Sequence, residues 1–456
     1  MLRRIRNLQD VVDWGLCTGC GACAYACNNH AVSLVNVQSV GIRPHFADDC
    51  GSCSNCLSIC PGYSVDAQLA TAVAGSSRAD EEFGSTLEIW EGYASDPEIR
   101  YRGSSGGVLS ALALYCLEQE KMGFVLHTAG DEAKPWLNKT VQSRTRAQLL
   151  SRAGSRYAPA SPCDGLAAIE SSDSPCVFIG KPCDTAAVMA ARRERRSLDQ
   201  RLGLVLTFFC AGTPSTDGTL DLLQRVGVKR PAVEQLQYRG EGWPGGFTVI
   251  SNQGKQRNFI PYDQAWGVLT SYVSLRCHLC PDGLGRIADI SCGDAWEQHD
   301  PTVKNPGVSI ILVRTQRGRE ILRRAAEAGY VRLIASGAES VFAAQSNLLS
   351  RRRELFARLL VLKLLLIPIP NFRSFSLFRG WGRLPVSKKL RTIAGTLRRA
   401  ILRGWWKRRT RICKGPNPSP LHMAVPGVRS EHSRLSLSNS APTEIRRGRN
   451  DSQPSC

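Results

Sequence analysis

CTGCGACAYAC (17–27) and CGSCSNCLSIC (50–60) repeat one spacing, Cys-x-x-Cys-x-x-Cys-x-x-x-Cys, and Pro61 follows the second copy. In such a run the first three thiolates bind one cube of iron and sulfide, while the fourth ligates the partner cube. The spacing therefore predicts a ferredoxin-like module with two 4Fe–4S clusters. The expected ligands are Cys17, Cys20, Cys23 and Cys60 for one cluster, and Cys27, Cys50, Cys53 and Cys56 for the other.

Other uses of these cysteines fit the spacing less well. A structural zinc site takes two separated Cys-x-x-Cys pairs that form one tetrahedron. A disulfide framework belongs to secreted chains, and the opening MLRRIRNLQDVVDWGLC has no apolar segment or cleavage site of a signal peptide. Asn28 stands where proline often follows the fourth cysteine, which affects the expected turn and not the ligands. Reduced thiols favour a cytoplasmic protein.

The positive charge of the chain is unevenly placed. Its 456 residues suffice for two or three domains and carry a net charge of +20. Residues 371–456 contain 19 Lys or Arg against three acids, a balance of +16, which leaves +4 for the preceding 370 residues. Nucleic acid is the least expected partner, because this basic tail contains no folded reader motif.

The region 341–414 combines apolar and basic residues at helical spacing. Its most apolar stretch, LFARLLVLKLLLIPIP (355–370), is interrupted by Arg358 and Lys363, so a membrane-spanning helix is not expected. A basic amphipathic helix with tryptophans either rests on an anionic membrane at its inner face or docks on the body of the protein. Residues 415–456 are rich in Ser, Pro, Asn and Arg and are expected to be disordered.

Two further regions lie between the module (1–62) and this tail. Residues 63–85 are small and polar and predict a linker. In the domain 86–340, short apolar runs alternate with helical periodicity, which indicates an α/β core. Strands are expected at 177–179, 204–209, 247–250, 308–313 and 331–334, and helices at 109–120 and 318–328. The whole chain is thus expected to be α+β, a ferredoxin-like module fused to an α/β domain with a helical and then disordered tail.

Four more cysteines lie in turns of the second domain. Cys183 (GKPC) and Cys210 (FFCAG) each follow an expected strand, and Cys277 and Cys280 form CHLC. Four thiols from turns at one end of a sheet could hold a third 4Fe–4S cluster. From spacing alone, an equal interpretation is that they are buried packing residues.

Six segments then occur in order: SSGGVLSAL (104–112), GSRYAP (154–159), FIGKPCD (178–184), FFCAGTPS (208–215), YRGEGWPGGF (238–247) and RCHLCPD…ADISCGDAW (276–296). Together they resemble the β subunit of coenzyme F-420 hydrogenase/dehydrogenase. The resemblance implies FAD, iron–sulfur clusters and a second two-electron carrier or pigment as substrate. By family position it makes Cys183, Cys210, Cys277 and Cys280 ligands of a cluster next to the flavin.

The resemblance also implies a flavin site. The turn GSSGG (103–107) precedes an expected helix, whose free N–H groups can stabilise a pyrophosphate. Alone such a turn is more often a helix cap, but in the family pattern it becomes the FAD phosphate site. Lys181 would stabilise negative charge near the flavin; many relatives carry a small polar residue there, which weakens the case for coenzyme F-420 as substrate. The expected FAD contacts are Ser104, Ser105, Gly106, Gly107, Gly154, Ser155, Arg156, Tyr157 and Lys181.

Other polar and sulfur residues are given structural roles. Asp289 and Asp294 are expected to hold their loop through local side-chain to backbone hydrogen bonds, with substrate orientation as the alternative. His127 and His278 are candidate proton donors, although an isolated histidine is usually structural; the general acid stays unassigned. Packing roles are expected for Cys116, Cys163, Cys176, Cys292, Cys413 and Cys456.

The sequence therefore predicts an FAD-dependent iron–sulfur oxidoreductase. Electrons would pass between a ferredoxin-like carrier, the N-terminal clusters, the third cluster, FAD and an organic substrate, in either direction. The substrate would be a small molecule, a pigment or a deazaflavin. The alternative is a non-catalytic electron-transfer subunit that serves a partner oxidoreductase.

Overall fold

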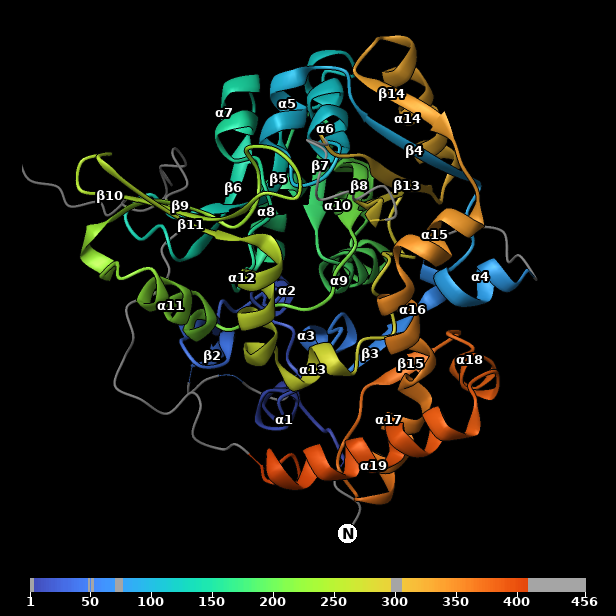
Figure 1. Cartoon of the computed structure of the whole chain (residues 1–456). Coiled ribbons are helices and arrows are strands. Elements are labelled where there is room, and N and C mark those ends of the chain that lie inside the picture. The colour runs from blue at the N-terminus through green and yellow to red at the C-terminus, as the bar shows by residue number, and fades with distance from the viewer. Residues whose placement is uncertain (1–3, 48–49, 51–52, 70–76, 297–305, 409–456) are drawn as a thin grey trace, which may run out of the picture. The chain divides into compact units, whose positions relative to one another are not determined.

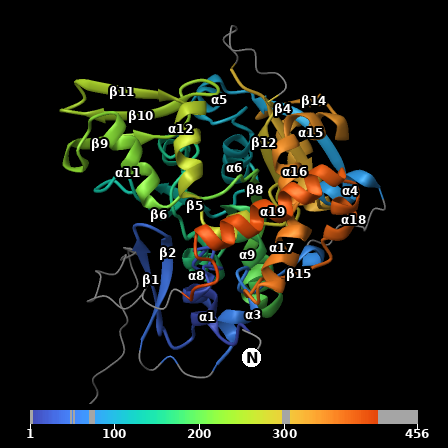
Figure 2. The same cartoon turned by 60° about the horizontal axis from the view of Figure 1, so that its bottom comes forward.

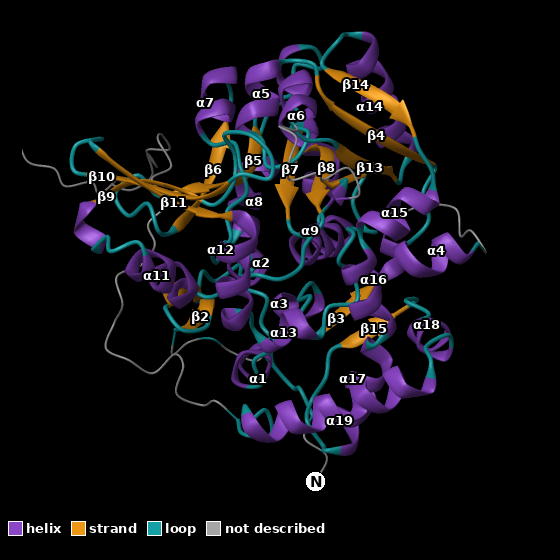
Figure 3. Cartoon of the chain, viewed as in Figure 1, coloured by secondary structure: helices purple, strands orange, loops and turns teal. Residues whose placement is uncertain are grey.

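An eight-stranded mixed sheet organises the second domain (Figures 1 and 3). The computed structural model describes residues 4–47, 50, 53–69, 77–296 and 306–408. The strands are β4 (Glu88–Ala94), β5 (Val125–Gly130), β6 (Asn138–Ser143), β7 (Cys176–Gly180), β8 (Leu202–Phe208), β12 (Ile290–Asp294), β13 (Ser309–Val313) and β14 (Val331–Ala335). Their order is β14-β4-β13-β12-β8-β7-β5-β6. The pairs β5–β7, β7–β8 and β8–β12 are parallel, and the other neighbours are antiparallel.

Successive residues of the central strands pack on opposite faces of this sheet. Val177 and Leu204 face one apolar cluster, and the next residues along each strand, Phe178 and Val205, face another. Such near-continuous apolar runs are typical of strands that are covered on both faces. The predicted α/β core is therefore confirmed. The first cluster includes α6 (Val108–Glu118), α7 (Arg146–Ser151) and α14 (Gln316–Glu327), and the second includes α8 (Leu166–Glu170), α9 (Pro182–Glu194) and α10 (Arg196–Arg201).

A separate three-stranded antiparallel sheet lies beside the main one. Its strands are β9 (Val233–Gln237), β10 (Gly246–Ser251) and β11 (Gln256–Pro261), in the order β11-β10-β9. Two helices, α11 (Thr216–Arg225) and α12 (Tyr262–Leu269), share its apolar cluster. The strand expected at 247–250 belongs to this sheet and not to the α/β core.

The N-terminal module is packed against the second domain. Its β1 (Val32–Val37) and β2 (Gly41–Phe46) form an antiparallel hairpin. Tyr25 and Ala26 share one apolar cluster with Phe178 of the main sheet. The helices of the module are α1 (Leu8–Asp13), α2 (Ala22–Ala26) and α3 (Asn55–Ser58).

The segment 63–85, expected to be a linker, instead contains ordered elements where the structure describes it. Strand β3 (Ser64–Asp66) pairs in parallel with β15 (Asn371–Arg373) near the other end of the chain. Helix α4 (Arg78–Phe83) begins with a capping box between Ser77 and Asp80. Phe83, the last residue of this helix, is buried because it packs with residues of the main sheet and of α15 (Ala338–Ala344). A few apolar side chains thus fix a segment whose composition is polar.

The C-terminal region is helical as far as residue 402. Among the described residues, no helix has the length and apolar character needed to cross a membrane. The expected disordered segment 415–456 lies outside the described residues. The helices are α15 (Ala338–Ala344), α16 (Ser346–Arg353), α17 (Leu355–Leu364), α18 (Leu377–Gly382) and α19 (Val386–Leu402), the last two drawn in orange and red in Figure 2.

Candidate functional site: three cysteine sets and a large cavity

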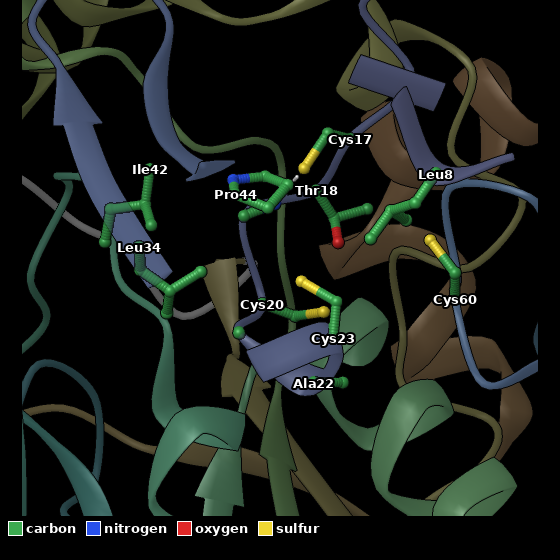
Figure 4. Close-up of a pocket in the computed structure, with 12 residues that line it drawn as sticks. Leu8, Cys17, Thr18, Cys20, Ala22, Cys23, Leu34, Ile42, Pro44 and Cys60 are labelled. Atoms are coloured by element: carbon green, nitrogen blue, oxygen red, sulfur yellow. Dashed lines mark hydrogen bonds between the residues drawn. The ribbon is translucent and has the colours of Figure 1, made fainter. Parts of the chain in front are cut away.

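Four cysteines from both copies of the repeated motif line one small cavity (Figure 4), and we call them the inner set. Cys17 and Cys20 lie in the loop before α2, Cys23 lies in α2, and Cys60 follows α3. Three of these side chains are buried and Cys23 is half-buried. Most of the remaining wall is apolar or backbone, with Leu8, Leu34, Ile42 and Pro44 among its side chains.

The electrostatics of the inner set fit a cluster ligand site. Burial raises the pKa of Cys60, and the neighbouring Cys20 and Cys17 raise it further. Burial and the other cysteines likewise raise the pKa of Cys23. Four thiols packed together in an apolar wall cannot all lose their protons without a compensating charge, and iron–sulfur clusters bind cysteine in its deprotonated form. A backbone donor is also present, since Gly19 N lies 3.4 Å from the Cys17 sulfur.

The loop that carries the inner set is pressed against the second domain. Gly21 has a φ of +90°, and a Cβ atom there would lie 2.8 Å from the carbonyl oxygen of Ser161, so only glycine fits. The backbone N–H of Cys163 donates to the carbonyl of Cys20 over 3.0 Å. The neighbouring Cys163 thiol also lowers the pKa of Cys20. Cys163, expected to be a packing residue, is therefore in direct contact with a candidate ligand.

The other four cysteines of the repeated motif, Cys27, Cys50, Cys53 and Cys56, form what we call the outer set. Burial raises the pKa of Cys56, and the electrostatic influence of the other three raises it further. Cys50 and Cys53 are exposed, whereas Cys27 and Cys56 are half-buried. Cys27 thus lies with the second motif and Cys60 with the first, which is the crossed grouping of a two-cluster run.

The four cysteines of the second domain also lie close together, and we call them the third set. Cys183 is the second residue of α9, after β7, and Cys210 follows β8. Because these strands are parallel neighbours, both cysteines lie at the carboxyl ends of the strands. Cys277 and Cys280 come from α13 (Leu275–His278) and the turn after it. Burial raises the pKa of Cys210 to about 12, and Cys277 and Cys280 contribute to this shift. Chain topology, rather than local spacing, assembles this set.

Two contacts connect the inner set to the third set. Arg276, which precedes Cys277 and is 2% exposed, donates to the carbonyl of Pro61 over 2.8 Å, and Pro61 follows Cys60. Burial raises the pKa of Cys17 and of Cys280, and the positive charge of Arg276 acts against this increase at both thiols. On the second route, the Cys163 sulfur lies 3.6 Å from the carbonyl oxygen of Asp184, beside Cys183.

The three sets do not form single-ion sites. Among the described residues, no three His, Cys, Asp or Glu side chains converge closely enough to hold one metal ion. A four-iron cluster is much wider than one ion, so its four thiolates stand further apart. The four grouped thiols of each set fit the ligand chemistry of such a cluster.

A cavity of about 770 Å³ lies beside the third set. Cys210 and Lys181 belong to its wall, together with Gly293 and Asp294 from β12. Eight of the nine expected FAD contacts line it. Gly106, the ninth, lies behind the wall, where its N–H donates to the Ser309 hydroxyl over 2.9 Å.

The turn 103–107 begins helix α6 at the edge of this cavity. Gly107 has a φ of +75°, and a Cβ atom there would lie 2.8 Å from the carbonyl oxygen of Ile99. The Ser104 hydroxyl accepts a hydrogen bond from the backbone of Ser155, and the Ser105 hydroxyl donates to the carbonyl of Val308 over 3.0 Å. The hydroxyls therefore hold the turn in shape, while the N-terminus of α6 offers the backbone N–H groups and positive dipole that suit a pyrophosphate.

Two basic residues of the expected flavin site are engaged by the protein itself. Arg156 as a whole is half-buried, and its guanidinium donates to Asn138 and to the carbonyls of Pro135, Leu137 and Leu236. It is therefore neither an exposed surface residue nor free to clamp a phosphate. Lys181 is 7% exposed and lies 2.7 Å from the Asp184 carboxylate. Burial opposes the charged form of Lys181, but Asp184, Cys183 and Cys210 together outweigh this effect and raise its pKa.

Aromatic side chains and one ion pair form a further wall that the sequence did not reveal. Arg239 makes two hydrogen bonds, of 2.9 and 2.8 Å, to the Asp294 carboxylate, which also accepts from the Trp243 indole. The Arg239 guanidinium lies over Tyr262 and Trp296, whose rings stack 5.4 Å apart. Asp294 thus holds distant elements together, and the expected local turn bond is wrong. The WPGG stretch at 243–246 was the available signal, since it lies in a segment shared with the family.

Asp289 likewise accepts hydrogen bonds from residues distant in the sequence, namely from Val205 N over 2.8 Å and from the Thr315 hydroxyl, so it is structural but not through a local turn.

His127 borders the cavity and hydrogen-bonds Ser143; burial, with Arg152 nearby, lowers its pKa to about 4. Burial and surrounding arginines lower the pKa of His278 to about 4 as well. Cys116, Cys176 and Cys292 are buried as packing residues are, although Cys292 also reaches the cavity wall, and Cys413 and Cys456 lie outside the described residues.

Comparison with known families assigns most of the chain. The profile described as "Coenzyme F420 hydrogenase/dehydrogenase, beta subunit N-term" matches residues 89–167, and the corresponding C-terminus profile matches residues 174–337. A "4Fe-4S binding domain" profile matches residues 10–33, which contain the first cysteine motif.

Curated relatives have related names. A coenzyme F420-dependent sulfite reductase of Methanocaldococcus jannaschii is 24% identical over 69% of this chain, which spans only 47% of that protein. A coenzyme F420 hydrogenase subunit beta of Methanosarcina barkeri is 26% identical over 55% of this chain and 82% of its own length. An F420-dependent formate dehydrogenase 1 subunit beta of Methanococcus maripaludis is 25% identical over 54% of this chain and 61% of its own.

A solved structure shares the fold. It is a chain of the F420-reducing [NiFe] hydrogenase complex from Methanosarcina barkeri, with a TM-score of 0.50 and 22% identity over 64% of this chain and 97% of that one. The two beta-subunit profiles together match more than half of the residues, in the order that the quoted segments follow. The chain belongs to the coenzyme F420 hydrogenase/dehydrogenase beta subunit family.

Proposed function

We propose that this protein is an iron–sulfur flavoprotein oxidoreductase that passes electrons between a ferredoxin-like carrier and an organic substrate. The observation that supports this proposal most strongly is that the outer set, the inner set, the third set and the cavity follow one another in space, each adjacent to the next. A flavin bound in the cavity would exchange electron pairs with the substrate and single electrons with the clusters.

The outer set gives an external carrier access to the chain of sites. Cys50 and Cys53 are exposed, so a docked carrier can approach them closely. The inner set lies deeper, where Leu8, Leu34 and Ile42 exclude water from its thiols. An apolar shell of this kind controls solvent access and redox potential. The outer set is thus accessible to a carrier, and the inner set is shielded from water, as expected if electrons enter at the first and pass through the second.

Arg276 supports passage from the inner set to the third set. It is buried, bonds the backbone beside Cys60 and precedes Cys277 in the chain. Its fixed positive charge lies close to Cys17 and Cys280. An electron that arrives at either set adds negative charge, which a nearby cation stabilises.

Lys181 lies where the third set meets the cavity. Cys183 and Cys210 both act on its charge, and its side chain contributes to the cavity wall. The Asp184 carboxylate and the carbonyl of Ala160, 3.2 Å away, hold the ammonium group in place. A cation that the fold positions in advance stabilises negative charge that develops on a ligand there.

The second candidate is an electron-transfer subunit that binds no organic substrate. The observation that favours it is that two relatives are named as beta subunits of larger enzymes. Anaerobic mixing of the purified chain with a reduced ferredoxin separates the two functions. Flavin reduction followed by turnover of an added small molecule supports the oxidoreductase, whereas flavin reduction without turnover of any tested substrate supports the subunit.

Filling the cavity should remove flavin and leave iron in place. Ser110 is half-buried on α6 and lines the cavity, so Ser110→Trp places an indole in the proposed flavin volume. We expect flavin occupancy to fall by about tenfold or more, which corresponds to ~1.4 kcal/mol of lost binding. Flavin extraction and iron analysis of anaerobically purified protein measure both cofactors.

Gln119→Trp provides the matched control for this experiment. Gln119 is exposed at the other end of the same helix, so its substitution should change neither flavin nor iron. Full flavin occupancy in the Ser110→Trp variant would show that the cavity is not the flavin site.

A further inference from the structure

Helix α19 buries its small residues and exposes its large apolar ones. Thr392, Thr396 and Ala400 face the body of the protein and are at most 6% exposed. Val386, Leu390, Leu397 and Ile401 recur at helical spacing and are 70%, 62%, 41% and 60% exposed. In a helix that only packs on its own protein, the large apolar residues would be expected to be buried and the small residues to be exposed.

The segment that carries the apolar row has only basic charged residues of its own; four of these form ion pairs with acids outside the segment, namely Arg358, Arg379, Arg383 and Arg408. Residues 355–408 contain thirteen Lys or Arg and no Asp or Glu. On α19 itself, Arg391 and Arg398 are exposed along one side of the apolar row, and Arg403 follows the helix. The row ends near Leu402 and Trp406, which are 71% and 48% exposed. A tryptophan with an apolar ring and a polar N–H suits the boundary between lipid and water.

The helix is fixed to the body of the protein. Ala400 of α19 and Trp405, which lies just after the helix, pack in one apolar cluster with residues of α1 and α17. Arg408 forms ion pairs of 2.8 and 2.9 Å with Asp10 and Asp13 of α1. In Figure 2, α19 crosses the front of the molecule next to α17. The exposed row is therefore presented by a rigid element and is not a fraying end.

We propose that α19 docks the protein on an anionic lipid surface. The helix would lie in the plane of the membrane, with its apolar row at the boundary between headgroups and acyl chains and its arginines among the phosphates. The clustered Lys and Arg and the lack of acidic residues over 355–408, beside an exposed apolar row, favour a lipid headgroup layer, because anionic leaflets attract basic amphipathic helices. This surface is independent of the flavin site.

Vesicle co-sedimentation of the full-length holoprotein tests the lipid assignment. We expect the protein to sediment with vesicles of phosphatidylcholine and phosphatidylglycerol, and much less with phosphatidylcholine alone. Combined Leu390→Ser, Leu397→Ser and Ile401→Ser substitutions should weaken binding by about tenfold or more. Arg391→Gln with Arg398→Gln should weaken it by about tenfold, and high salt should have a similar effect.

Phe259→Ser is the matched control, because Phe259 is an equally exposed apolar residue (53%) on β11 and should not affect sedimentation. Unchanged iron content and circular dichroism would show that each variant is folded. The proposal is overturned if the serine variant sediments with vesicles like the wild type. It is also overturned if the wild type does not sediment with vesicles and instead forms a complex with an acidic protein through this face.

Discussion

Cys17→Ser combined with Cys60→Ser is expected to cost one cluster, whereas Cys17→Ser combined with Cys27→Ser is expected to cost two. Cys17 and Cys60 both belong to the inner set, so the second substitution removes a ligand from a site that the first has already disrupted. Cys27 belongs to the outer set with Cys56. With three four-iron clusters, the chain would bind about twelve irons; the first variant should then retain about eight and the second about four.

Iron and sulfide analysis of anaerobically purified protein, with electron paramagnetic resonance of the reduced state, measures this difference. Cys116→Ser is the matched control, because its thiol is buried in the core at a distance from the three sets, and it should retain all iron. The reverse result, with about four irons in the Cys17/Cys60 variant and about eight in the Cys17/Cys27 variant, would mean that each motif holds its own cluster.

Removing one partner of the buried ion pair should destabilise the second domain strongly. Arg239→Met leaves the Asp294 carboxylate, which is 16% exposed, without its bidentate partner. An unpaired buried charge of this kind costs about 3–5 kcal/mol. The midpoint of chemical unfolding should therefore move to clearly lower denaturant concentration, and flavin occupancy should fall with it because both residues line the cavity.

Two further variants test whether the loss of stability comes from the unpaired charge. Adding Asp294→Asn to Arg239→Met removes the isolated charge and should recover part of the lost stability. Arg225→Met breaks the solvent-exposed pair with Asp221 and should cost less than about 1 kcal/mol. Equal effects of Arg239→Met and Arg225→Met would contradict a special role for the buried pair.

The elements that local sequence determines were predictable. The strands expected at 177–179 and 204–209 correspond to β7 and β8, because their apolar runs are buried on both faces of the sheet. The spacing of the repeated cysteines also implies crossed groups of four, and the inner and outer sets have that grouping. In both cases the signal lies within a few neighbouring residues.

Features that depend on distant contacts were not predictable in the same way. The segment 63–85 was expected to be a linker because its composition is polar, but β3 pairs with β15, some 300 residues away. Arg156 was assigned to the flavin site from the family pattern and Asp294 to a local turn, whereas the partners of both residues come from elsewhere in the fold. The aromatic wall formed by Tyr262 and Trp296 depends on the same kind of contact.

The pairing of α1 with the segment after α19 has a consequence for how the protein matures. Ala400, Trp405 and Arg408 pack over the region of the cysteine loops, but they follow these loops by more than 300 residues in the chain. Chains fold progressively from the N-terminus as they leave the ribosome. During synthesis the cysteine loops therefore leave the ribosome well before the end of α19 and the residues after it, so clusters inserted at that stage would enter loops that these residues do not yet cover.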